Sequence, residues 1–253
     1  MALIVIEKSQ DAFLEAASHR IVNAAEESVR ARDRFLWVLS GGKTPNQLYA
    51  LLAQPSHRDR LPWSKTHVFW GDERCVPPDH ADSNFRAAQE ALLSHVPISP
   101  NRIHRIPADM ESPSDAATAY EKTLHEIVVG GEPAPRFDFV MLGVGDDGHT
   151  ASLFPGTPAL NETRRWVVGQ RVPSLGADRI TLTFPALNAA RHVMFLCAGQ
   201  GKASILKEIF QDGASGRYPA QGILPVDGEL VWLLDAAAAS QLPAGVLSKS
   251  VKS

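Results

Sequence analysis

The chain has 253 residues, 44% of them hydrophobic and 21% charged, a composition that excludes a largely disordered protein and provides for a sizeable core. The net charge of -3, without a long basic run, disfavours nucleic acid or an anionic membrane surface as the partner. No stretch rich in Gly, Ser or Pro resembles a linker, so we expect one domain over residues 1–253.

The predicted elements alternate between helices and strands. Apolar residues at helical spacing from Phe13 to Ala25 predict a helix, and the continuous apolar run Phe35–Leu39 predicts a strand. Further helices are predicted at residues 47–53, 85–93, 116–129 and 203–210, and further strands at 68–70, 139–142, 166–168, 180–184, 193–197 and 230–234. Nearly unbroken apolar strands between helices indicate an α/β fold with a doubly wound, mainly parallel sheet and helices on both faces.

Two features bear on the cellular location. The apolar run at Met1–Glu7 is too short for a signal peptide, and no stretch approaches the ~20 apolar residues that a membrane-spanning helix needs. The two cysteines, Cys75 and Cys197, predict neither a disulfide framework nor a cysteine-based zinc site. We therefore expect a cytoplasmic protein.

In a parallel sheet ligands bind at the carboxyl ends of the strands, so the residues after each strand are the first functional candidates. Phe35–Leu39 is followed by Ser40-Gly41-Gly42-Lys43-Thr44-Pro45. The glycines permit a sharp turn, Thr44 is a good N-cap and Pro45 suits the first helical position, which predicts an anion site. An ordinary strand-to-helix turn is the alternative. The segment matches no ATP or NAD fingerprint, so neither cofactor is predicted.

Charged residues follow two further strands. In Asp72-Glu73-Arg74 a carboxylate can orient a sugar hydroxyl and the guanidinium can clamp a phosphate, with a surface ion-pair cluster as the alternative. Just beyond, Asp82 or Ser83 is expected to cap the next helix. Lys202 opens a helix after Gly199-Gln200-Gly201, where its ammonium can face an anion or be solvated.

The segment Gly143-Val144-Gly145-Asp146-Asp147-Gly148-His149 carries the most information about chemistry. Its glycines permit a close approach of the backbone, and Asp147 can orient the imidazole of His149. An ordinary imidazole titrates near physiological pH, as a general base requires. The other histidines are interpreted as structural or exposed. His149 is therefore predicted to perform acid–base catalysis.

Taken together, these segments resemble the 6-phosphogluconolactonase family, within the larger group that includes glucosamine-6-phosphate deaminase. The matching blocks cover nearly the whole chain: Leu39–Tyr49, Trp70–Ala88, Phe137–Pro155, Ile180–Ala203 and Pro219–Asp235. Their order, their spacing and their positions at strand ends carry the resemblance. It implies the deaminase-like form of the doubly wound fold.

Two positions separate the lactonases from the deaminases. The deaminases have Tyr where this chain has Arg74, and Glu where it has Phe154. Phe154 can neither take nor give a proton, so the resemblance favours the lactonases over an isomerase or deaminase of amino sugar phosphates. A sugar-phosphate sensor without catalytic activity is a further alternative. The intact Asp147 and His149 argue against it.

The resemblance implies hydrolysis of 6-phospho-D-glucono-1,5-lactone to 6-phospho-D-gluconate in the oxidative pentose phosphate pathway, without a metal or organic cofactor. We expect His149, supported by Asp147, to activate water, and Asp72 to orient substrate hydroxyls. The candidate phosphate ligands are Arg74, Lys202, the turn Ser40–Thr44 and, with solvated charges as the alternative, Arg171 and Arg179. The alternative role for Arg74 is to stabilise the developing oxyanion. The expected partner is this small molecule, bound by a monomer or homodimer.

Overall fold

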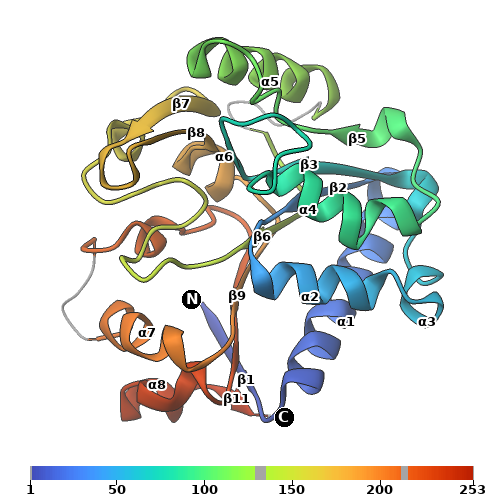
Figure 1. Cartoon of the computed structure of the whole chain (residues 1–253). Helices are drawn as coiled ribbons and strands as arrows, with labels where there is room; N and C mark the ends of the chain where they lie inside the picture. Colours follow the sequence, from blue (N-terminus) through green and yellow to red (C-terminus); the bar gives the residue numbers. More distant parts are fainter. Residues whose placement is uncertain (1, 129–134, 212–215, 253) are drawn as a thin grey trace.

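The large sheet holds the hydrophobic core. The structure is a computed structural model and describes residues 2–128, 135–211 and 216–252 (Figure 1). Within these ranges eight parallel strands form the sheet, in the spatial order β11 (Val251–Lys252), β1 (Leu3–Glu7), β10 (Glu229–Asp235), β9 (His192–Cys197), β6 (Phe139–Leu142), β2 (Phe35–Leu39), β3 (Thr66–Trp70) and β5 (Ile103–His104). The predicted mainly parallel sheet is confirmed.

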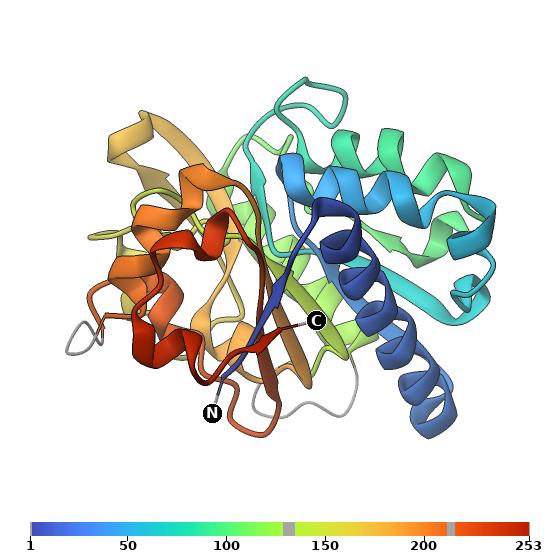
Figure 2. The same cartoon turned by 90° about the horizontal axis from the view of Figure 1, so that it is seen from below.

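Helices cover the sheet on both faces. They are α1 (Gln10–Arg32), α2 (Lys43–Leu52), α3 (Pro55–Arg58), α4 (Asn84–Ala91), α5 (Pro113–Ile127), α6 (Phe184–Asn188), α7 (Ala203–Ile209) and α8 (Ala244–Leu247). Figures 1 and 2 show α1 on one side of the sheet and α7 with α8 on the other. Val129, the last residue of the helix predicted at 116–129, lies outside the described ranges. None of the helices described is long and apolar enough to span a membrane.

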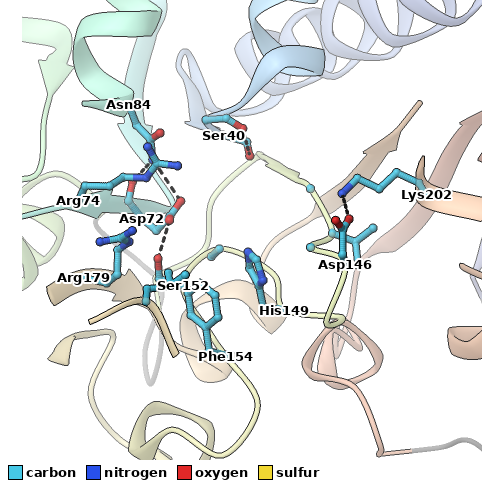
Figure 3. Close-up of a pocket in the computed structure, with 16 residues that line it drawn as sticks. Ser40, Asp72, Arg74, Asn84, Asp146, His149, Ser152, Phe154, Arg179 and Lys202 are labelled. Carbon is cyan, nitrogen blue, oxygen red and sulfur yellow. Dashed lines mark hydrogen bonds and ion pairs between the residues drawn. The ribbon is translucent and has the colours of Figure 1, made fainter. Parts of the chain in front are cut away.

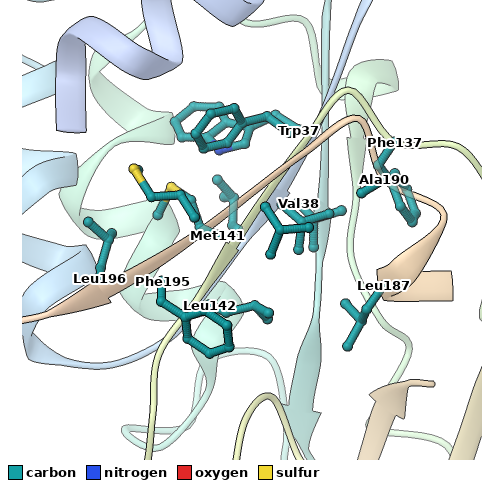
Figure 4. Close-up of a cluster of buried hydrophobic side chains, with 14 of the residues drawn as sticks. Trp37, Val38, Phe137, Met141, Leu142, Leu187, Ala190, Phe195 and Leu196 are labelled. Atoms are coloured by element: carbon teal, nitrogen blue, oxygen red, sulfur yellow. The ribbon is translucent and has the colours of Figure 1, made fainter. Parts of the chain in front are cut away.

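The central strands are buried on both faces, which explains their unbroken apolar sequences. Every residue of β2 and of β6 is buried. Trp37 and Phe195 are among the largest side chains that are fully buried, and Figure 4 shows them with Met141 and Leu142 in one cluster. Burial of each such side chain stabilises the fold by roughly 1.5–3 kcal/mol, so this cluster fixes the strands that carry the site.

A second, antiparallel sheet corrects one prediction. It consists of β4 (Asp72–Arg74), β8 (Ala177–Leu182) and β7 (Val167–Val172), in that order. The strands predicted at 166–168 and 180–184 therefore belong to this small sheet and not to the parallel one, because apolar periodicity does not specify a strand's partner. Phe184, predicted as strand, begins α6.

The start of α2 corrects another prediction. Gly42 is the N-cap, with φ 108°, and the helix begins at Lys43. Thr44 is therefore not the N-cap, and Pro45 occupies the third helical position. The physical reason is that the turn requires a positive φ directly after Gly41, which glycine adopts at little cost. The predicted cap of α4 is Ser83, whose side chain accepts a hydrogen bond from the Arg86 N–H.

The order of the strands places the functional segments together. After β2 the chain adds β3 and β5 to the sheet on one side of β2. It then returns to add β6 and β9 on the other side of β2. This reversal between β2 and β6 is the position at which ligands bind in open α/β sheets. The carboxyl ends of four neighbouring strands, β9, β6, β2 and β3, meet there.

Candidate active site

A cavity of about 500 Å³ opens at the carboxyl ends of these strands. Residues after four strands line it: Ser40 and Gly41 after β2, Asp72 and Arg74 after β3, Gly143–Asp146 with His149 after β6, and Lys202 after β9. Further lining residues are Asn84, Ala151, Ser152, Phe154, Leu175 and Arg179. The four segments that were selected from the sequence therefore meet in one cavity.

Some predicted residues lie outside the lining of this cavity. Gly42 and Lys43 are exposed, and Thr44 is half-buried in the first turn of α2. Arg171 forms an ion pair with Asp178 at 3.3 Å and lines an adjacent groove, which it shares with Arg74 and Arg179. Asp147 reaches the cavity indirectly, through its contact with His149.

The imidazole of His149 is tied to Asp147. Oδ1 of Asp147 lies 2.5 Å from Nδ1 of the ring and also accepts a 3.1 Å hydrogen bond from the His149 N–H. Burial by itself raises the pKa of Asp147, but these hydrogen bonds and the His149 charge outweigh it and hold that pKa below its usual value. An ionised carboxylate only accepts hydrogen bonds, so Nδ1 carries the proton. Nε2 has no hydrogen-bond partner among the described residues.

Asp72 is held on the opposite side of the cavity (Figure 3). Its Oδ2 accepts a 2.7 Å hydrogen bond from the Ser152 hydroxyl, and the Asn84 side chain donates to its backbone carbonyl at 3.0 Å. Asn84 packs against Gly41 so closely that a Cβ at Gly41 would lie 1.9 Å from Asn84 Oδ1. The Ser40–Gly41 turn and Asp72 are therefore joined through one amide.

Glu73, the middle residue of the charged triplet, has a structural task. Its buried carboxylate accepts hydrogen bonds from the N–H groups of Asn84 and Phe85, both at 2.8 Å, and from the Ser83 hydroxyl at 3.1 Å. Burial raises its pKa, and these hydrogen bonds partly offset the rise. Glu73 thus anchors the start of α4, so that Asn84 faces the cavity.

Cationic groups flank His149 on two sides (Figure 3). Arg74 and Arg179 are directly opposite each other in β4 and β8. Burial, followed by the charge of Arg74, lowers the pKa of Arg179. On the other side, Lys202 Nζ lies 2.6 Å from Oδ1 of Asp146, whose side chain is 84% exposed. The arrangement suits a small ligand that bears an anionic group.

The backbone beside His149 is strained. Ala151 has φ 47°, and it is one of two residues other than glycine with a positive φ in the described chain. Such strain costs on the order of 1–3 kcal/mol and persists only where the surrounding structure imposes it.

No group of three or more His, Cys, Asp or Glu side chains in the described ranges is arranged to hold a metal ion.

Comparison with known proteins gives the family. The sequence matches the family described as glucosamine-6-phosphate isomerases/6-phosphogluconolactonase over residues 8–232. The chain belongs to this family. The resemblance noted from the sequence segments is thereby confirmed.

Relatives within this family match along nearly their whole length. The chain is 42% identical to the 6-phosphogluconolactonase of Nostoc sp., over 92% of this chain and 95% of the relative. It is 44% identical to that of Synechocystis sp., over 90% and 93%. The solved 6-phosphogluconolactonase from Trypanosoma cruzi superposes with a TM-score of 0.83 at 30% identity, covering 96% of this chain and 98% of that one. A monomeric glucosamine-6-phosphate deaminase, 18% identical, shares the fold of the family with a TM-score of 0.79.

Proposed function

We propose that this chain hydrolyses 6-phospho-D-glucono-1,5-lactone to 6-phospho-D-gluconate, as a step of the oxidative pentose phosphate pathway. One observation carries the proposal: His149, paired with Asp147, lines a cavity that Arg74, Arg179 and Lys202 also line. The imidazole suits activation of water, and the cations suit a phosphorylated substrate. The names of the Nostoc and Synechocystis relatives support the same reaction.

In the proposed mechanism, Nε2 of His149 takes a proton from water while the water oxygen attacks the lactone carbonyl carbon. The carbonyl π electrons move to oxygen and form a tetrahedral oxyanion. When the oxyanion collapses, the bond between this carbon and the ring oxygen breaks, and the ring oxygen takes the proton from Nε2. Asp147 stabilises the imidazolium between the two transfers. The imidazole ends each cycle in its starting state, and the new carboxylic acid releases its proton to water, which gives 6-phosphogluconate.

The remaining groups bind the substrate in this proposal. Asp72, held by Ser152, orients a sugar hydroxyl. The phosphate is bound either by Lys202 with the Ser40–Gly41 turn or, on the other side of His149, by Arg179. Arg74 either shares that task or lies over the oxyanion, and kinetics of Arg74→Ala assign the role. A raised KM with an unchanged kcat assigns it to the phosphate, whereas a lowered kcat assigns it to the transition state.

The test is an assay of the purified protein with freshly prepared lactone, in which acid release is followed at constant pH and the spontaneous rate is subtracted. We expect saturable, protein-dependent hydrolysis. A parallel assay with glucosamine 6-phosphate should release no ammonia, and ammonia release would instead support the deaminase. Tight binding of 6-phosphogluconate without turnover of the lactone would contradict the proposal in favour of a sensor.

A further inference from the structure

Two residues whose side chains cannot transfer protons, Gly145 and Phe154, lie against the imidazole ring of His149. Gly145 precedes His149 in the loop after β6, and Phe154 follows it. We infer that Gly145 and Phe154 are positioning residues, which confine the His149 imidazole to a slot and keep Nε2 directed at the substrate. This inference rests on the proposed lactone hydrolysis.

Gly145 forms one wall of the slot. The loop turns back on itself, so that the Gly145 N–H donates to the His149 carbonyl at 2.8 Å and the Gly148 N–H donates to the Gly145 carbonyl at 3.0 Å. A Cβ at Gly145 would lie 2.1 Å from both Cε1 and Nδ1 of the imidazole, and 2.9 Å from Oδ1 of Asp147. Any side chain at this position would displace the ring and disturb its partner. Glycine is therefore required at position 145 because the imidazole occupies the space that a side chain would need.

Phe154 forms the other wall. Its ring stacks on the imidazole with centroids 4.0 Å apart and an angle of 26° between the planes. Phe154 is 5% exposed, and its carbonyl accepts hydrogen bonds from the N–H and the hydroxyl of buried Thr157, at 3.2 and 2.8 Å. Two residues earlier, the backbone of Ser152 is bonded to the Thr181 hydroxyl and to the Gln170 amide. The wall is therefore fixed by buried contacts.

The slot and Asp147 restrict different motions of the imidazole. The hydrogen bond from Nδ1 to Asp147 defines which nitrogen is protonated, but rotation about that bond would still swing Nε2 out of line. Both contacts oppose this rotation, since a turned ring would lose its stacking on Phe154 and has little free space beside Gly145. A displacement of about 1 Å in a reacting group can cost about 10²-fold in rate.

Steady-state kinetics of Gly145→Ala and Phe154→Leu test the inference. For each variant we expect kcat to fall roughly 10- to 100-fold, while KM stays within about twofold, because the binding groups are untouched. Phe154→Tyr keeps a stacked ring and should retain most of the activity. Gly71→Ala is the matched control, because its Cβ would make an ordinary 3.6 Å contact with Val38. Wild-type kcat in both Gly145→Ala and Phe154→Leu would overturn the inference.

A second measurement does not depend on the reaction. Nitrogen NMR of the histidine side chains should show His149 in wild type, Gly71→Ala and Phe154→Tyr as the tautomer protonated at Nδ1. Gly145→Ala should show mixed tautomers, because its Cβ would displace the ring from Oδ1 of Asp147. Phe154→Leu should keep the tautomer protonated at Nδ1 but show averaged nuclear Overhauser contacts of the ring protons, because the ring can turn about its bond to Asp147. Retained thermal unfolding transitions check the folding of both variants. Unchanged His149 signals in those two variants would overturn the inference. If the wild type opened no lactone, the proposed function would fail, and these spectra alone would decide on the slot.

Discussion

The hydroxyl of Ser152 donates a 2.7 Å hydrogen bond to the carboxylate of Asp72, although 80 residues separate the two in the chain. Ser152 is 1% exposed and belongs to the segment that carries His149, whereas Asp72 follows β3. The bond engages Oδ2 of Asp72, while Oδ1 accepts only a long 3.5 Å hydrogen bond from the Asn84 amide and is the more accessible oxygen for a substrate hydroxyl. This bond thereby fixes the segment that carries His149 relative to Asp72, and it is called the Ser152–Asp72 frame below.

Replacing Ser152 by Ala tests this frame. A hydrogen bond to a charged group contributes about 1.5–3 kcal/mol, so we expect kcat/KM for the lactone to fall roughly 10-fold or more. Ser94→Ala is the control, because the exposed Ser94 hydroxyl pairs only with Gln89 in the described structure. Equal kcat/KM for Ser152→Ala and the wild type would show that Asp72 needs no support from the hydroxyl.

Asp146→Asn tests whether Lys202 binds the phosphate. In the free protein the ammonium of Lys202 is paired with Asp146 at 2.6 Å, so a phosphate must compete with this carboxylate. Removing the charge should lower KM by about two- to fivefold with little change in kcat, since an exposed ion pair is worth about 0–1 kcal/mol. A raised KM would mean that Asp146 positions Lys202 and does not compete for it.

Protonation of the half-buried histidine pair His67 and His104 should weaken the fold as pH falls. Arg102 donates to Nε2 of His67 at 2.7 Å, and Nδ1 of His67 lies 3.0 Å from Nε2 of His104. Burial, with the positive charge of Arg102, lowers the pKa of each histidine to about 4. The unfolded chain, with histidine pKa values of about 6.5, then binds more protons between pH 6.5 and 4. The free energy of unfolding should therefore decrease through this window.

Urea unfolding at several pH values measures this effect. The double substitution His67→Gln and His104→Gln should flatten the dependence between pH 6.5 and 4, even if it lowers stability at pH 7.5. A wild-type slope in the double variant would contradict the assignment to this pair.

At the end of the sheet opposite the cavity, the carboxylate of Asp138 should contribute more to the free energy of unfolding than that of Asp227. It is 2% exposed and lies 2.8 Å from Arg32 and 3.4 Å from Arg191, and it also accepts from the Leu36 N–H at 2.8 Å. Asp138→Ala leaves these donors unpaired and should cost about 2–4 kcal/mol in urea unfolding. Asp227→Ala removes an ion pair of an 85% exposed carboxylate with Arg136, and should cost less than about 1 kcal/mol. Similar losses in both variants would contradict this account.

The sequence predicted the strands that are buried on both faces. β2 and β6 were predicted with the bounds that the structure shows, because burial demands continuous apolar runs. The missed strands were β1, whose run was considered only as a possible signal, and the short β4, β5 and β11. Two or three residues carry no periodicity, so tertiary contacts alone define those short strands.

The rule that ligands bind at strand ends selected much of the cavity, including Ser40, Asp72, His149 and Lys202. It missed the roles of Asn84 and Ser152. Asn84 follows the cap of α4, and its local sequence contains no signal that its amide meets Gly41. Ser152 owes its role to Asp72 and Thr181, which approach it only in the folded chain. Periodicity describes local conformation, and such long-range contacts lie beyond it.

Rate measurements on His149→Ala test the central claim most directly. The variant and the wild type would be compared for opening of fresh 6-phosphogluconolactone at pH 7.5, with the spontaneous rate subtracted and folding checked by thermal unfolding. We expect kcat to fall by roughly 10²-fold or more, the usual contribution of a general base. A folded His149→Ala variant that retains the wild-type kcat would contradict the claim that this imidazole activates water.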